Sequence, residues 1–276
     1  NSIAFFIQAS VSMTEVWFVG QLGSSSLAAM ALVFPLLMLT QTLSAGAMGG
    51  AVASAIARAL GAGDRQRAEQ LIWHALAMAV IGALLLFTAF WVFGAHFLRF
   101  LGGNNDTLDQ ALRYCLVLFS GGVFLWFMGV VSAIYRGMGE MKFPALVMAA
   151  SALVQVPLSA ALVLGAFGAP QLGIVGAAVS AVITAFLLSG IMILRLIIGS
   201  TAIKIRRSHF GFEPQHFREI LKVALPASLS PILTVTSILC LTAIVGRFGE
   251  EALAGYGIGS RIEFLLIPLV FGIGAS

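Results

Sequence analysis

The amino-acid sequence predicts an all-α polytopic membrane protein, and three observations lead to this prediction. The chain has 276 residues, of which 60% are hydrophobic and only 9% are charged. Its mean hydropathy is +1.03. Its apolar runs repeatedly reach the length of about 20 residues that a helix needs to cross a bilayer. A soluble domain of this size has no need for so much apolar surface, so the composition indicates a helical membrane protein.

Eight apolar segments are long enough to be predicted as membrane spans. The second and the seventh exceed what a bilayer requires, so we expect them to tilt or to extend beyond it. The predicted spans cover residues 2–22, 26–57, 70–99, 110–135, 144–167, 172–199, 220–246 and 252–276.

The connections between these spans alternate in charge. Three of the regions that link them hold 11 of the 15 Lys and Arg residues, whereas the connections Gln21–Ser25 and Gly165–Gln171 hold none. By the positive-inside rule the basic connections lie in the cytoplasm, so the N-terminus is predicted to be cytoplasmic. The basic residues are Arg58, Arg65, Arg67, Arg136, Lys142, Arg195, Lys204, Arg206, Arg207, Arg218 and Lys222.

Glu15 is the only ionisable residue in the apolar run from Ile3 to Leu22. A carboxylate at membrane depth costs roughly 2.5–3.5 kcal/mol even on the translocon scale, and such residues mark functional sites by default. We therefore predict that Glu15 faces a cavity and carries a proton or a cation. The alternative is a structural carboxyl, hydrogen-bonded to a Ser, a Thr or a backbone group.

Polar side chains in two other predicted spans are candidates for the wall of the same cavity. Gln155 and Ser159 lie four residues apart, on one face of the fifth span. They could hold Glu15 or a water molecule, or they could simply join helices, as polar residues often do in membranes. Gln41, in the second span, is a further candidate for the substrate cavity.

Arg261 and Glu263 lie about ten residues into the eighth span. Charges at that depth are not expected to face lipid. Because they are two residues apart, they do not pair with each other on one helix face. Either they line a substrate cavity or gate between two lobes, or they form structural ion pairs with other residues.

The sequence predicts neither an enzyme nor a metal site. Cys115 and Cys240 lie inside apolar runs without a CxxC pattern. No Ser/His pair, Asp pair or HExxH pattern is found at membrane depth. The histidines show no metal-ligand spacing, and we expect His209 and His216 to lie in a loop.

A sequence pattern recurs at an offset of 226 residues. Val-Gly-x-x-Gly-x-x-x-Leu-Ala begins at Val19 and again at Val245. Six predicted spans separate the copies, so the two repeats have the same orientation and the pseudo-two-fold axis follows the membrane normal. Transporters built from such halves bind substrate between the lobes, near the midplane. We predict an N-terminal lobe of six spans over residues 1–199, a cytoplasmic linker over 200–219, and the start of a second lobe over 220–276.

Several motifs along the chain resemble the multidrug and toxic compound extrusion (MATE) family of transporters. In the family's first-span motif an acid, usually Asp, precedes a Val-Gly or similar pair by a few residues. The matching segments here are Thr14–Gly23, Arg58–Asp64, Tyr135–Gly139, Gln155–Leu158 and Gly168–Ala177. The resemblance rests on the order and spacing of all these segments taken together.

The resemblance implies a MATE-like six-helix lobe plus the first two helices of a second, parallel-repeat lobe of a twelve-span antiporter. Such a protein exports cationic or amphipathic compounds in exchange for H⁺ or Na⁺. It implies residence in a bacterial inner membrane, contact with the lipid bilayer and small organic cations, no cofactor, no nucleic acid, and a monomer at full length. The alternative is a lipid-linked oligosaccharide flippase of the same superfamily, although such proteins usually carry several basic residues in the central cavity.

The chain also departs from the family's pattern. The first-span acid is Glu15 rather than Asp, and Gln155 stands where Asn is common. No Asp or Glu occurs between Glu140 and Glu213, where some members carry an acid in the sixth span. The resemblance therefore assigns ion coupling to Glu15.

Overall fold

The computed structural model describes residues 2–199 and 213–274, and within these ranges every regular element is a helix. Side chains of residues 2–6, 8, 9, 105 and 263–274 fall outside that description. The elements are α1 (Ser2–Gly20), α2 (Ser24–Gln41), the π-helix η1 (Thr42–Met48), α3 (Gly49–Gly61), α4 (Arg65–Phe100), α5 (Asn105–Ser120), α6 (Gly122–Gly137), α7 (Lys142–Leu164), the 3₁₀ turn η2 (Ala166–Gly168), α8 (Ile174–Ile198), α9 (Pro214–Gly246) and α10 (Glu250–Gly274).

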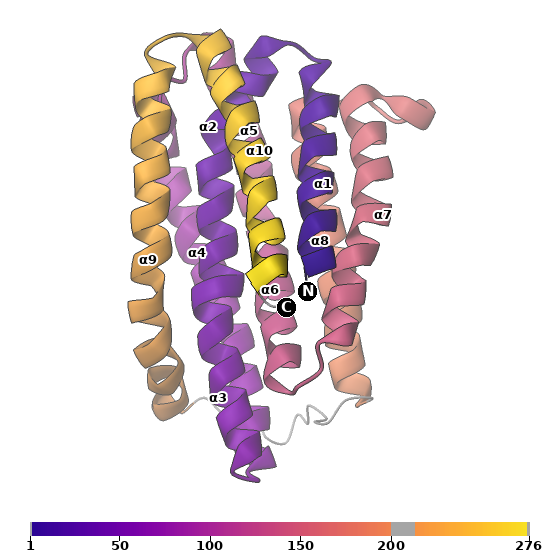
Figure 1. Cartoon of the computed structure of the whole chain (residues 1–276), viewed down its shortest axis with the longest axis vertical. Coiled ribbons are helices and arrows are strands. Elements are labelled where there is room, and N and C mark those ends of the chain that lie inside the picture. Colours follow the sequence, from indigo (N-terminus) through magenta and orange to yellow (C-terminus); the bar gives the residue numbers. More distant parts are fainter. Residues whose placement is uncertain (1, 200–212, 275–276) are drawn as a thin grey trace.

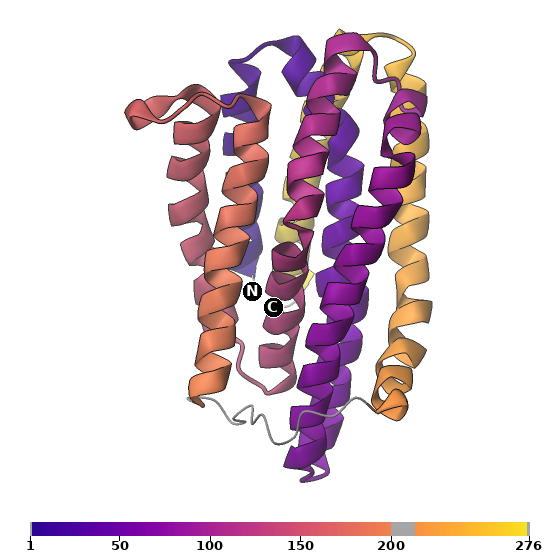
Figure 2. The ribbon, with the colours of Figure 1, turned by 180° about the vertical axis from the view of Figure 1, so that it is seen from behind.

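The helices run roughly parallel to one long axis (Figure 1). Among the described residues, five helical segments are long and apolar enough to cross a membrane, and six if α5 and α6 count as one bent span. The predicted first and eighth spans are the helices α1 and α10. Seen from behind, α4 and α8 lie on the face away from α10 (Figure 2). Large apolar side chains of α4, such as Leu85 and Trp91, are exposed, as expected of a lipid-facing surface.

The predicted second span is one continuous helical segment, Ser24–Gly61, with a π-helical turn in its middle. A π turn displaces backbone carbonyls from the regular hydrogen-bond pattern of the α-helix. One of them, the Ala45 oxygen, accepts a hydrogen bond from Arg136 Nη2 at 3.2 Å. Gly129 of α6 packs directly against this turn, since a Cβ there would lie 2.9 Å from Ser44 Oγ. The missing side chain of Gly129 therefore lets α6 approach the π turn closely.

The predicted fourth span is not straight. Helices α5 and α6 meet at Gly121 with a bend of 54°. Adjacent glycines, Gly121 and Gly122, are a common cause of such a break. A Cβ on Gly121 would lie 2.3 Å from Val182 Cγ1, so the bend also brings the backbone against α8.

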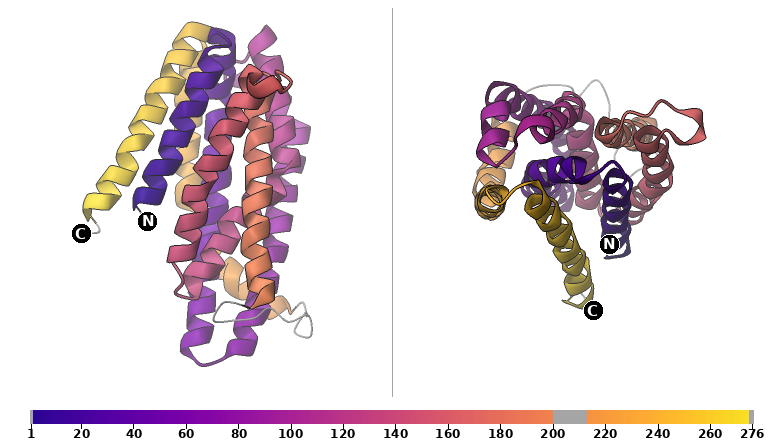
Figure 3. Two further views of the ribbon diagram at one scale, coloured as in Figure 1. Left: turned by 90° about the vertical axis from the view of Figure 1, so that its right-hand side faces the viewer. Right: turned by 90° about the horizontal axis from the view of Figure 1, so that it is seen from above.

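Two buried apolar clusters hold the bundle together. The first joins α3, α4, α6 and α8, and it continues into α9 through Ile220 and Ala224. The second joins α1, α2, α5 and α8, and it continues into α10 through Leu253 and Ala254. Helices α9 and α10 are thus packed onto the preceding helices. Figure 3 shows α1 and α10 side by side, leaning out of the bundle.

The predicted repeat corresponds to two turns of the same conformation. Helix α1 ends at Gly20 and helix α9 at Gly246, and three residues later Gly23 and Gly249 have φ angles of 116° and 99°. The amide of Leu27 donates to the Gly23 oxygen at 3.3 Å, and that of Leu253 donates to the Gly249 oxygen at 3.1 Å. A left-handed φ favours glycine, because a Cβ clashes with the backbone there.

We predict that Gly23→Ala lowers the free energy of unfolding by about 1–2 kcal/mol, because alanine is strained at this φ. Thermal unfolding in detergent measures the change. Gly50→Ala is the matched control, since Gly50 is exposed, helical and free of nearby atoms. Equal stability of Gly23→Ala and Gly50→Ala would contradict the prediction.

Candidate functional site

Glu15 lies near the end of α1 that leads into the Gly23 turn, with five residues of helix still to follow. Its side chain is 9% exposed. Helix α1 packs against α7 on one side and α10 on another. The carboxyl group therefore lies between a helix of the predicted first lobe and a helix of the predicted second lobe.

Glu15 is held by an amide of the fifth span. Gln155 Nε2 of α7 donates a hydrogen bond to Glu15 Oε1 at 2.8 Å, and both side chains are buried. This is the one hydrogen bond of the Glu15 carboxyl among the described residues. A neutral amide orients the carboxylate without neutralising its charge, so the group remains able to bind a proton or a cation.

Ser159 lies one helical turn beyond Gln155 and is completely buried. Its hydroxyl has no hydrogen-bond partner among the described residues. Between the two residues, Pro157 lacks the N–H that would continue the helical ladder. Unpaired polar groups of this kind are where water or ions bind in protein interiors.

Arg261 approaches Glu15 from α10. The guanidinium is buried, with Nη1 3.5 Å from the Ser12 oxygen and Cζ 4.9 Å from the centre of the Phe34 ring. Glu15 and Arg261 attract each other electrostatically. They do not form an ion pair within 4.0 Å in the part of the chain that the structure describes.

Tyr114 of α5 completes this group, although the sequence alone does not single it out. It is 3% exposed and lies close enough to Glu15 and Arg261 for their charges to act on its hydroxyl. A single tyrosine in an amphipathic stretch gives no signal in sequence. Its position depends on the bend at Gly121 and on the packing of α5 against α2.

Two other predicted cavity residues are not placed beside Glu15. Gln41 is exposed at the end of α2. With a rise of 1.5 Å per residue, it lies roughly 18 Å further from the α1–α2 turn than Glu15 does. Glu263 belongs to α10, but its side chain lies outside the described residues.

One end of the bundle is closed by a polar network, here called the polar end. Thr107 Oγ1 donates to Glu250 Oε1 at 2.6 Å, which links α5 to the start of α10. Ser25 Oγ and Gln110 Nε2 both donate to Asp106 Oδ2, at 3.0 and 2.6 Å. These bonds tie α2, α5 and α10 together at the end of the bundle that is uppermost in Figure 1.

Backbones also touch at the polar end. A Cβ on Gly246, at the end of α9, would lie 2.3 Å from the Leu101 oxygen, and one on Gly102 would lie 2.7 Å from the Gly246 Cα. The connection between α4 and α5 therefore packs directly against the α9–α10 turn.

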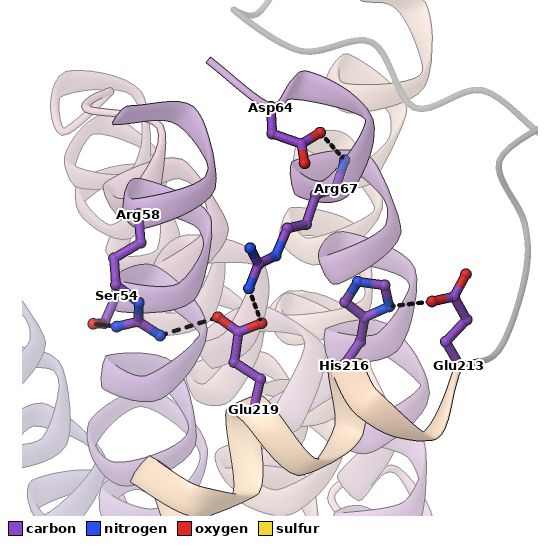
Figure 4. Close-up of polar contacts among 7 residues, drawn as sticks. All are labelled: Ser54, Arg58, Asp64, Arg67, Glu213, His216 and Glu219. Carbon is purple, nitrogen blue, oxygen red and sulfur yellow. Dashed lines mark hydrogen bonds and ion pairs between the residues drawn. The ribbon is translucent and has the colours of Figure 1, made fainter. Parts of the chain in front are cut away.

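The opposite end, here called the basic end, is joined by ion pairs (Figure 4). Glu219 of α9 accepts from Arg58 Nη2 of α3 at 3.2 Å and from Arg67 Nη2 of α4 at 2.8 Å. These contacts connect α9, which begins inside the predicted linker, to helices of the predicted N-terminal lobe.

A buried histidine reinforces this connection. The amide of Glu213 donates to His74 Nε2 at 2.9 Å, so the start of α9 is bonded to α4. The prediction that His216 lies in a loop is wrong. Helix α9 begins at Pro214, a residue well suited to the first helical position, and His216 is buried near the His74 ring, with ring centroids 5.0 Å apart.

The fold and the site define a helical membrane protein with a repeated turn and a buried carboxylate between two packed groups of helices. The family profile described as MatE matches residues 2–161 and 226–276. The chain belongs to this family.

Relatives and solved structures agree with this assignment. The chain is 27% identical over 277 residues to a probable multidrug resistance protein NorM of Thermotoga maritima, covering 98% of the chain and 58% of the relative. It is 25% identical over 281 residues to a FAD transporter of Shewanella oneidensis, covering 100% of the chain and 61% of that protein. The chain thus spans about three fifths of the length of these relatives.

Two solved structures have the same fold. An inward-facing multidrug resistance MATE family transporter of the MOP superfamily matches with a TM-score of 0.86 and 26% identity, over 94% of this chain and 58% of that one. The MATE multidrug transporter DinF-BH matches with a TM-score of 0.89 and 22% identity, over 99% of this chain and 60% of that one. Because the second structure is only 22% identical, its similarity shows the shared fold alone.

We predict that Gln155→Leu lowers the free energy of unfolding at neutral pH by roughly 1–3 kcal/mol, because it leaves a buried carboxylate without its donor. Thermal unfolding in detergent measures this loss. In the Glu15→Leu/Gln155→Leu double variant both polar partners are gone, and most of the loss should be recovered.

Gln41→Leu is the control for the Gln155 variant, since it removes an exposed amide of the same size. We expect a change within about 0.5 kcal/mol. A similar loss in both single variants, or no recovery in the double variant, would show that the hydrogen bond to Glu15 contributes little.

Proposed function

We propose that the chain forms the first lobe and the start of the second lobe of a transporter that exports cationic or amphipathic compounds in exchange for H⁺ or Na⁺. The observation that carries this proposal is the position of Glu15. It is a buried carboxylate between α7 and α10, held by a neutral amide and not neutralised by an ion pair among the described residues. The similarity to a multidrug resistance protein supports the type of cargo.

Exchange follows from competition for one carboxylate. A proton or Na⁺ and a cationic cargo cannot both neutralise Glu15, so each lowers the affinity for the other by the same factor. Each also shifts the equilibrium between the two orientations of the lobes according to its differential affinity for them. The unpartnered hydroxyl of Ser159, one helical turn beyond Gln155, offers an additional oxygen for a cation.

The charge distribution supports one orientation in the membrane. Arg58, Arg67, Arg136 and Arg195 lie toward the basic end of the bundle, and we place that end in the cytoplasm by the positive-inside rule. Glu15 then lies in the outer part of the first span. We propose a bacterial inner-membrane location, a monomer at full length, and transport without an enzymatic reaction or a cofactor.

We expect Glu15→Gln to reduce gradient-driven efflux by the full-length protein at least about tenfold, because the amide cannot exchange a proton or hold Na⁺. Dye efflux from vesicles under an imposed pH or Na⁺ gradient measures this. Glu251→Gln is the control, since it removes an exposed carboxyl of α10 that has no ion-pair partner among the described residues. Efflux by Glu15→Gln at the rate of the parent protein would remove Glu15 from the mechanism.

A further inference from the structure

Arg261 has an unusual set of partners. It belongs to α10 of the predicted second lobe, yet its guanidinium contacts the first lobe, at the Ser12 oxygen and the Phe34 ring. The side chain is 5% exposed. An arginine cannot lose its proton in a protein, so this charge is permanently buried where α10 meets α1 and α2.

Arg261 lies within electrostatic reach of the coupling carboxylate. Its contact on α1 is the backbone oxygen of Ser12, three residues before Glu15, and the opposite charges of Arg261 and Glu15 attract each other. The titratable groups that act electrostatically on Arg261 are Glu15 of α1 and Tyr114 of α5. Helix α7 presents only the neutral amide of Gln155 here, and α2 presents the Phe34 ring. Among the described side chains that act electrostatically on Arg261, only Glu15 supplies negative charge at neutral pH.

The space around Arg261 is too small for cargo. The cavity that it lines has a volume of about 10 Å³, and its other walls come from α1, α2 and α10, including Val16, Met30 and Gly257. Such a volume holds about one water molecule. In this arrangement Arg261 is a packing contact between the lobes.

We propose, building on the proposed function, that Arg261 is a positioning residue that locks α10 against α1 and α2 while Glu15 is ionised. The ionised carboxylate compensates the buried guanidinium, so the closed contact is stable. When a proton, Na⁺ or a cationic cargo neutralises Glu15, the guanidinium keeps only a backbone oxygen and an aromatic ring. The closed contact then loses its main electrostatic support, and α10 separates from α1 and α2.

This lock supplies a property that exchange requires. An antiporter stays tightly coupled only if the empty carrier does not change orientation, whereas the carrier loaded with either ligand does. The empty carrier is the one in which Glu15 is ionised and Arg261 holds the lobes together. Either ligand releases the same lock, because both act on the charge of Glu15.

The lock is tested by a distance between the lobes. Spin labels at Asp109→Cys in α5 and Glu251→Cys in α10 report it, because both positions are exposed near the polar end. Of the two cysteines that the structure describes, Cys240 is exposed and is replaced by Ser, whereas Cys115 is buried. In the full-length protein without Na⁺, lowering the pH from about 8 to about 5 should reduce the closed fraction at least about fivefold. In a second series of measurements the closed fraction is followed while Na⁺ is titrated at fixed pH.

Arg261→Gln should abolish this response, with the closed fractions at the two pH values within about twofold of each other. Arg261→Lys should keep the direction of the response, because the positive charge remains. Arg247→Gln, which removes an exposed arginine after α9, should respond like the parent protein.

A response of Arg261→Gln equal to that of the parent protein would overturn the lock, as would a parent protein that responds to neither pH nor Na⁺. The distance between the spin labels can be measured without any transport taking place. If Glu15→Gln retained full efflux while the distance still responded through Arg261, the proposed function would fail and the lock would stand.

Discussion

The structure depends on one electrostatic constraint, which is the cost of burying the Glu15 carboxyl away from water. A charge at membrane depth persists only where other groups compensate it. Here the compensation is divided between the Gln155 amide on α7 and the guanidinium of Arg261 on α10. Because these two partners belong to different predicted lobes, any change in the charge of Glu15 alters the balance between contacts within one predicted lobe and contacts between the two.

The rest of the fold holds Glu15, Gln155 and Arg261 in position relative to one another. The Gly23 turn fixes where α1 ends, and the turn at Gly249 fixes where α10 begins, with the same backbone conformation. The hydrogen bond from Thr107 to Glu250 holds α10 at the polar end, and the ion pairs of Glu219 hold α9 at the basic end. The contact between the predicted lobes is thus held by polar groups at both ends, and the titratable Glu15 lies between them.

Much of this arrangement could be predicted from the sequence. A lone acid in an apolar run, a polar residue such as Gln155 on one face of another span, and a repeated turn motif each give a local signal, and the structure places Glu15 and Gln155 in contact. Other features give no local signal. The π turn at Thr42–Met48, the bend at Gly121 and the position of Tyr114 depend on tertiary packing. The start of α9 at Pro214 escapes prediction because its first turn is polar and continues the composition of the preceding basic connection.

The central claim is that cargo and coupling ion compete for the Glu15 carboxyl. Equilibrium binding of a cationic dye to the purified full-length protein, titrated against pH without Na⁺ and against Na⁺ at fixed pH, tests it most directly. The account predicts that dye affinity falls as one of these ions becomes more abundant, and that Glu15→Gln binds the dye weakly with no dependence on either ion. The same affinity and the same ion dependence in Glu15→Gln would contradict it.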